Sequence, residues 1–228
     1  MVSIIRMQFA LFVSLFIVMP GDFKKNENRN NKEAYYGVGS FLLEVVKVFF
    51  LAFIIIVPIR VFLFQPFFVQ GASMEPNFKD GQYLIVNELG YKKTDIGAGN
   101  AHFFSVEPFK NLERGEVIVF RYPKSPEQFF IKRVIGLPGE KIEIKDGIVR
   151  IYNPEYPDGF ILDESDYINS DIKTSGNISR QMEDNQYFVM GDNRSASHDS
   201  RSWGPLNKDN VMGRVLIRAW PIDKAEVY

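Results

Sequence analysis

The chain has 228 residues, enough for one domain of ordinary size together with a membrane segment. Its 27 basic and 28 acidic residues leave a net charge of −1, so the basic excess of a nucleic-acid-binding protein is missing. Cysteine is absent, which excludes disulfides, thiolate metal sites and a cysteine nucleophile.

The first of two apolar stretches covers residues 1–19 and is interrupted by Arg6. Its 13 residues from Met7 to Met19 are short for a membrane span and similar in length to the apolar core of a signal peptide. No Ala-x-Ala-like cleavage site follows, so a first transmembrane helix and a segment that does not span both remain open. Residues 22–40 form a polar loop rich in lysine and arginine, which the positive-inside rule places in the cytoplasm.

The second apolar stretch, residues 41–66, predicts a transmembrane anchor, since about 20 mainly apolar residues suffice to span a bilayer. Its charges are confined to Glu44 and Lys47 near one end and Arg60 near the other, where long side chains reach the interface. The alternative is a buried core helix. With the basic loop inside the cell, the chain after this anchor is expected on the extracytoplasmic side.

After residue 70 the sequence consists of short β-like runs separated by turns, which predicts a mainly β domain over residues 67–228. We expect a folded-over antiparallel sheet with barrel-like parts. Residues 91–111 are predicted as irregular, and residues 153–185 as a hairpin or loop inserted at the periphery. The predicted strands are 81–86, 116–120, 129–135, 141–144, 148–151, 187–190 and 215–220, with a hairpin turn at 145–147.

A serine and a lysine stand in settings that favour chemistry. Ser73 follows Gly71 and Ala72 in a turn without bulky neighbours, where its hydroxyl and backbone N–H can face a substrate carbonyl. Lys132 alternates with Phe130 and Val134 on one face of a predicted strand, so burial would lower its pKa. A desolvated lysine can take the proton of a serine hydroxyl. The alternatives are a surface turn for the serine and a solvent-facing lysine at a sheet edge.

The neighbouring charges are less informative. Arg133 falls on the opposite strand face, where it could equally be a solvated charge. A polar segment, Gly191–Arg201, lies between two hydrophobic strands and contains His198, which leaves a Ser-His pair formally open. We expect His198 to lie on the surface. His102 has no partner in view, and the chain shows no metal-ligand spacing, so no cofactor or metal is expected.

The chain carries four motifs after an apolar anchor, in the order Ser73–Pro76, Arg114–Phe120, Lys132–Glu140 and Gly191–Arg201. These motifs and their order resemble those of the bacterial type I signal peptidases, membrane enzymes that remove signal peptides from exported proteins. The resemblance covers about residues 44–80, 114–140 and 186–221. It implies a signal-peptidase-like folded antiparallel sheet domain with one or two N-terminal transmembrane helices.

The resemblance implies a role for each matching residue. Ser73 is the nucleophile and Lys132 the general base, with Ser197 orienting the lysine. Asp199 and Arg201 form a supporting salt bridge. The implied oxyanion donors are Ser73 and Gly71, and the implied substrate-binding residues are Met74, Pro76, Ile131 and Val134. Gly71 stands where some members carry a hydroxyl residue, Asn77 replaces the usual hydroxyl residue after the proline, and Glu140 replaces an aspartate.

The implied reaction is cleavage of preproteins after small residues, as in Ala-x-Ala, through an acyl-enzyme. The implied location is the plasma (inner) membrane, with membrane lipid and preproteins as partners, no nucleic acid, and a monomer as the simplest state. Apolar residues beside the nucleophile, Phe67, Phe68, Val69 and Phe78, are expected to hold it against the bilayer. The alternatives are an inactive membrane-tethered binding module and, less favoured, a self-cleaving repressor-type Ser-Lys protease.

Overall fold

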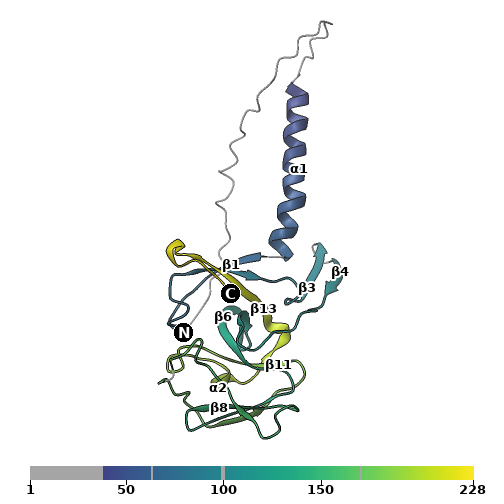
Figure 1. The fold of residues 1–228 in the computed structure, drawn as a ribbon. Coiled ribbons are helices and arrows are strands. Elements are labelled where there is room, and N and C mark those ends of the chain that lie inside the picture. The colour runs from purple at the N-terminus through teal and green to yellow at the C-terminus, as the bar shows by residue number, and fades with distance from the viewer. Residues whose placement is uncertain (1–37, 63, 99–100, 170) are drawn as a thin grey trace. The chain divides into compact units, whose positions relative to one another are not determined.

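The computed structural model describes residues 38–62, 64–98, 101–169 and 171–228 (Figure 1). Residues from Val61 to Tyr228 fall in one compact unit, and the described residues from Val38 to Arg60 fall in a second. The predicted apolar stretch at 1–19 and the polar loop after it lie outside the described residues.

Helix α1 runs from Val38 to Phe62, and its large apolar side chains between Phe41 and Ile56 are exposed. No helix in the described ranges is both long and apolar enough to cross a membrane. The span predicted at 41–66 is therefore not found there. The helix also ends earlier than predicted, because Phe64–Phe68 form strand β1 and pair with β2 along Tyr83–Asn87.

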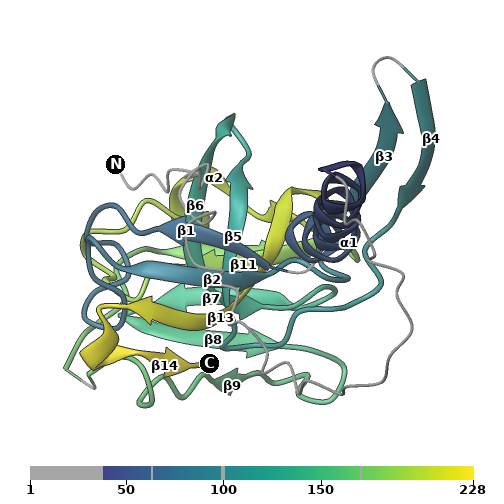
Figure 2. The ribbon, with the colours of Figure 1, turned by 90° about the horizontal axis from the view of Figure 1, so that it is seen from above.

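The compact unit is built mainly from antiparallel strands, which confirms the predicted mainly β fold. Figure 2 shows β1, β2 and β13 side by side in its largest sheet. That sheet has the order β1, β2, β13 (Val211–Trp220), β5 (Val117–Tyr122), β6 (Ser125–Gly136), β11 (Gln186–Met190) and β12 (Leu206–Asn207), with β14 (Glu226–Val227) paired to β13.

Two smaller sheets and short helices complete the unit. A four-stranded sheet has the order β10 (Ile178–Gln181), β7 (Lys141–Lys145), β8 (Ile148–Tyr152) and β9 (Phe160–Ile161). Strands β3 (Thr94–Ala98) and β4 (Ala101–Val106) form a hairpin. The short helices are α2 (Ser200–Trp203), η1 (Lys208–Asn210) and η2 (Ile222–Lys224).

All seven strands predicted from the sequence are present, and so is the turn at 145–147 between β7 and β8. The stretch predicted as irregular at 91–111 instead contains the β3–β4 hairpin, and the insert at 153–185 contributes β9 and β10. Strand β9 has two residues and β10 has four, so neither is long enough to show a clear alternation of its own. Pairing with β8 and β7 defines them.

Strand β6 divides the core because its side chains alternate between two faces. Ile131 packs in one buried cluster with Phe67, Met74 and Val119. Phe130 and Val134 pack in a second cluster that includes Ile118. Lys132 therefore lies between two core residues, on the face that the alternation predicts.

The expectation that Phe67, Phe68, Val69 and Phe78 face a bilayer is wrong for three of them. Phe67, Val69 and Phe78 are fully buried in the first core cluster, and only Phe68 is partly exposed. Strand β1 alternates between its two faces, and its buried face carries Gln65 and Phe67.

Candidate active site

Ser73 lies in the turn that joins β1 to β2. We call residues 71–78 the nucleophile turn, after the role predicted for Ser73. Two backbone hydrogen bonds close this turn: Glu75 N donates to Ala72 O at 3.2 Å, and Phe78 N to Met74 O at 2.9 Å. Gly71 begins it with a φ of 86°, in the left-handed region that favours glycine. The Gly71 amide donates to Asp80 Oδ1 at 2.6 Å, so this predicted oxyanion donor is already engaged.

Lys132 reaches the nucleophile turn from β6. Its Nζ lies 2.7 Å from Ser73 Oγ and donates to the carbonyl of Ile131 at 2.6 Å. Both Ser73 and Lys132 are 0% exposed. Burial lowers the pKa of Lys132 from 10.5 to about 8, against the opposing effect of the Asp199 and Asp192 carboxylates. The alternatives of a surface serine and a solvent-facing lysine are therefore wrong.

The polar segment 191–201 contacts the backbone of the nucleophile turn. The Asn193 backbone N–H donates to Ser73 O at 3.1 Å, and Asn193 Nδ2 donates to Ala72 O at the same distance. A Cβ at Gly191 would lie 2.3 Å from Ser73 O and 2.3 Å from Ser197 Oγ. Only glycine permits this close approach, which explains its place at the start of the segment.

Asp199 and Arg201 form the expected salt bridge. Arg201 Nε and Nη2 donate to Asp199 Oδ1 and Oδ2, both at 2.8 Å. Asp199 also accepts from the Arg201 backbone N–H at the start of α2, and from Gly191 N at 3.1 Å. Burial alone would raise the pKa of the Asp199 carboxyl, but these bonds and the Arg201 charge hold it below its usual value.

Ser197 lies in the same segment without the contact expected of it. Its Oγ is buried and has no hydrogen-bond partner in the described part of the chain. It is near enough to Asp199 to help lower the pKa of that carboxyl, although the two groups do not form a proper hydrogen bond. Its role in orienting Lys132 stays a prediction.

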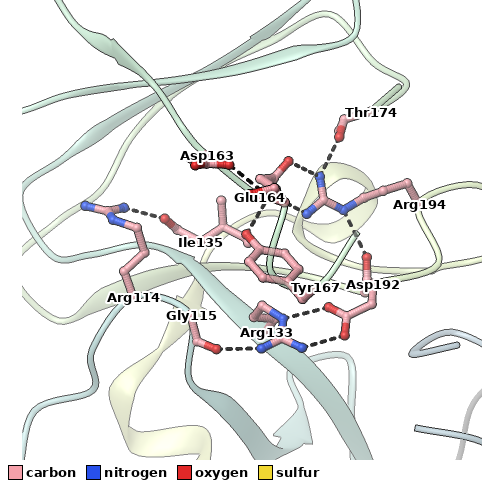
Figure 3. Close-up of polar contacts among 12 residues, drawn as sticks. Arg114, Gly115, Arg133, Ile135, Asp163, Glu164, Tyr167, Thr174, Asp192 and Arg194 are labelled. Carbon is pink, nitrogen blue, oxygen red and sulfur yellow. Dashed lines mark hydrogen bonds and ion pairs between the residues drawn. The ribbon is translucent and has the colours of Figure 1, made fainter. Parts of the chain in front are cut away.

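Arg133 is buried and paired on the opposite face of β6. Figure 3 shows its guanidinium facing Asp192, with Nε to Oδ1 at 2.8 Å and Nη2 to Oδ2 at 2.6 Å. Its Nη1 donates to Gly115 O at 2.7 Å. Asn77 Nδ2 donates to Asp192 Oδ2 at 2.8 Å, which links the nucleophile turn to this pair. The interpretation of Arg133 as a solvated charge is therefore wrong.

The predicted substrate-binding residues do not form an open surface. Met74, Ile131 and Val134 are buried in the core, and Pro76 is exposed. Their assignment stays a prediction.

His198 is exposed, and its Nε2 lies 3.0 Å from the hydroxyl of Tyr122. Ser73 Oγ is instead bonded to Lys132. The geometry therefore favours the Ser-Lys pair over a Ser-His pair.

A cavity of about 770 Å³ lies on the Arg133 side of the nucleophile turn, and Ser73 and Lys132 do not line it. Pro76, Asn77, Arg133 and Tyr167 are among its lining residues. No group of three or more histidine or acidic side chains in the described ranges is arranged to hold a metal ion.

Sequence reasoning missed several residues that surround this site. Asn77 was noted only as a departure from the family pattern, and Asp192 was not paired with Arg133. Glu164 and Tyr167 lie in the insert, outside every motif. A strand arginine beside apolar residues signals the need for a carboxylate, but it does not say which one.

Comparisons with known proteins identify the family of this chain. Residues 42–220 match the family model described as signal peptidase, peptidase S26. Signal peptidase IB of Staphylococcus aureus strain Mu50 is 31% identical over 193 residues, covering 80% of this chain and 92% of that protein. Probable signal peptidase I-2 of a Synechocystis species is 31% identical over 187 residues, covering 80% of this chain and 75% of that protein.

A crystal structure of a signal peptidase I from Enterococcus faecalis V583 is 28% identical, with a TM-score of 0.38, and covers 46% of this chain and 97% of that chain. The family match over residues 42–220 and the two relatives at 31% identity decide the assignment. The chain belongs to the signal peptidase family S26, as a serine peptidase of the type I signal peptidases.

Proposed function

We propose that this protein is a membrane-attached endopeptidase that removes signal peptides from exported preproteins, with Ser73 as nucleophile and Lys132 as general base. The observation that carries the proposal is the 2.7 Å contact between the Oγ of Ser73 and the Nζ of Lys132, both completely buried. A serine hydroxyl needs an adjacent base, and a lysine serves as one only when its pKa is lowered.

The proposed first half-reaction begins with neutral Lys132. A neutral amine has two N–H groups and one lone pair; the Ile131 carbonyl accepts one N–H, and the lone pair can take the Ser73 proton. Ser73 Oγ then attacks the scissile carbonyl, and the new amino terminus leaves with a proton from Lys132. In the second half, Lys132 activates the water that hydrolyses the acyl-enzyme.

The oxyanion is proposed to bind at the backbone N–H of Ser73. The hydrogen bond from the Gly71 amide to Asp80 argues against Gly71 as the second donor that the family pattern suggested. Glycine at this position then serves the left-handed backbone of the turn.

Small residues before the scissile bond, as in Ala-x-Ala, are proposed for the substrate. The support is steric: Ser73 has no exposed surface, and Met74, which follows it in the chain, is buried in the first core cluster. A bulky side chain next to the scissile carbonyl would have to displace core residues, at a cost typical of overpacking.

Helix α1 is proposed to attach the peptidase to the membrane, with the catalytic unit on the extracytoplasmic side. A helix with apolar side chains on every face is unstable in water unless protein or lipid covers it. The exposed side chains of α1 from Phe41 to Ile56 have this character. Flotation of the full chain with liposomes tests the attachment, and failure to float would refute it.

The first experiment measures cleavage of a preprotein with an Ala-x-Ala site, in detergent or liposomes, by the wild type, Ser73→Ala and Lys132→Met. Cleavage by the wild type that both substitutions abolish supports the proposal. Activity surviving in Lys132→Met would remove the proposed base. A folded wild type that cleaves nothing would favour the binding-module alternative, and cleavage of the chain itself alone would favour the self-cleaving one.

A further inference from the structure

One stretch of the insert, residues 164–175, contacts the candidate active site at several points, although it belongs to no motif. The structure describes all of it except residue 170. Four of its residues contact groups of the catalytic motifs or of the nucleophile turn: Glu164, Tyr167, Thr174 and Ser175.

The strongest contact is made by Glu164. Arg194, in the polar segment 191–201, is only 2% exposed, and its Nη1 and Nη2 donate to the two Glu164 carboxylate oxygens at 2.8 and 2.5 Å (Figure 3). The same guanidinium bonds Thr174 Oγ1 and the carbonyl of Gly191. A buried guanidinium without a carboxylate is costly. Glu164 therefore holds the start of the segment that backs Ser73.

Tyr167 extends this contact to the nucleophile turn. Its hydroxyl donates to Glu164 Oε1 at 2.9 Å, and its ring centroid lies 4.2 Å from the Arg133 guanidinium carbon, so the ring sits between the two (Figure 3). Its backbone carbonyl accepts from Asn77 Nδ2 at 2.7 Å. The same Asn77 amide binds Asp192, the partner of Arg133.

The far end of the stretch is itself anchored. The Thr174 backbone N–H donates to Gly147 O in the β7–β8 turn at 3.1 Å, and Thr174 is buried. Ser175 accepts from Arg201 Nη1, the partner of Asp199. The arginines of the lysine motif and of the polar segment, Arg133, Arg194 and Arg201, thus each contact this one stretch.

We propose that residues 164–175 position the catalytic machinery, with Glu164 as the principal positioning residue. The stretch holds the segment 191–201, whose Asn193 binds the backbone of Ser73, so Glu164 acts on the reaction through Arg194. This inference rests on the proposed role of Ser73 and Lys132.

The kinetic test compares Glu164→Gln, Glu164→Asp and a matched control, Glu155→Gln, which makes the same chemical change at an exposed site of the same insert. Glu164→Gln is expected to lower kcat by roughly 10- to 100-fold with KM within about twofold, since misplaced catalytic groups impair chemistry more than binding. Glu164→Asp keeps the charge and should stay within about threefold of wild type. Glu155→Gln should match wild type.

Two further variants test the inference even if Glu164→Gln folds poorly. They also separate this inference from the proposed function. Tyr167→Phe removes only the hydroxyl that supports Glu164 and should lower kcat by a smaller factor. In an Arg194→Met background, Glu164→Gln should cause no further loss, because the buried charge that it compensates is gone.

Amide hydrogen exchange of residues 191–201 requires no activity and should be faster in Glu164→Gln than in wild type. A cleaving wild type whose kcat and exchange are unchanged by Glu164→Gln would overturn the inference and leave the proposed function intact. A wild type that cleaves nothing would overturn the proposed function, and the exchange comparison would still decide whether Glu164 holds the segment.

Discussion

Lys132 and Arg133 are adjacent basic residues of β6 whose side chains lie on opposite faces of the strand. Among the described residues, one of them is paired with a carboxylate and the other is not. Arg133 is paired bidentately with Asp192, and both groups are buried. Lys132 is also buried, but within the described chain it forms no salt bridge, and its hydrogen bonds go to a hydroxyl and a carbonyl. A paired buried cation keeps its proton, whereas an unpaired one is desolvated and releases it more readily.

The two faces of β6 therefore contribute differently to the site. The Arg133 face joins the nucleophile turn, the strand and the polar segment through Asn77, Gly115 and Asp192. The Lys132 face carries the proposed base, whose pKa is lowered to about 8 by burial. The nearby Asp199 and Asp192 carboxylates act against the shift; each is hydrogen-bonded to an arginine, and the Arg201 charge itself lowers the pKa of Lys132.

Replacing Lys132 by arginine, and Arg133 by lysine, exchanges the two kinds of basic side chain. The first of these substitutions should have the largest effect on activity. Lys132→Arg places a permanently charged guanidinium where a neutral base is required, and should reduce kcat/KM by about 10⁴-fold, as loss of a catalytic group does in related systems. Arg133→Lys keeps the charge of the paired face and should retain measurable cleavage. Preprotein cleavage assays of both variants check this, and substantial activity in Lys132→Arg would refute the base.

Removing the carboxylate that pairs with Arg133 should mainly lower the stability of the fold. Asp192→Asn leaves Arg133 buried without its carboxylate and should lower the free energy of unfolding by about 3–5 kcal/mol. Urea denaturation measures the change. Asp184→Asn makes the same substitution at an exposed site and should change stability by less than about 0.5 kcal/mol. Similar losses in the two variants would show that the pair contributes nothing special.

The lowered pKa of Lys132 should make the free energy of unfolding depend on pH. Lys132 loses its proton near pH 8 in the folded protein but near 10.5 when unfolded, so between these values the unfolded chain binds more protons. The free energy of unfolding should therefore rise from pH 8 to 10.5, by about 3 kcal/mol for this group. The same contribution is lost as pH falls from 10.5 to 8, and below pH 8 the group adds no further change because both states are protonated. The difference between wild type and Lys132→Met, measured by denaturation at each pH, should show this rise. A difference independent of pH would contradict the lowered pKa.

The smallest effect is expected at Ser197. Once Lys132 has taken the Ser73 proton, its ammonium has three N–H groups, and the unpartnered Ser197 Oγ is available to accept the third. Ser197→Ala should lower kcat by about tenfold, a contribution typical of one hydrogen bond to a charged group. Its unfolding free energy should stay within about 0.5 kcal/mol of wild type, because the hydroxyl forms no hydrogen bond with the residues that the structure describes. Ser202→Ala, at an exposed serine of α2, is the control. Equal kcat values in the two variants would assign Ser197 no role.

Much of the framework followed from local patterns. Alternation with period two placed Phe130, Lys132 and Val134 on one face of β6, and the structure buries all three. The seven predicted strands formed for the same reason. The contacts that complete the site join residues far apart in the chain, such as Asp192 with Arg133 and Glu164 with Arg194, and no local pattern announces them.

The sequence by itself determined the mainly β fold and the burial of Lys132, because strand alternation is a property of neighbouring residues. The order of its motifs determined the resemblance to the type I signal peptidases, and that resemblance implied the meeting of Ser73 with Lys132. Only the tertiary structure decided that Phe67 and Phe78 belong to the core, that Arg133 is paired rather than solvated, and that the insert supports the site. Each of these outcomes depends on which distant group fills the space beside a side chain, and packing of the whole chain decides that.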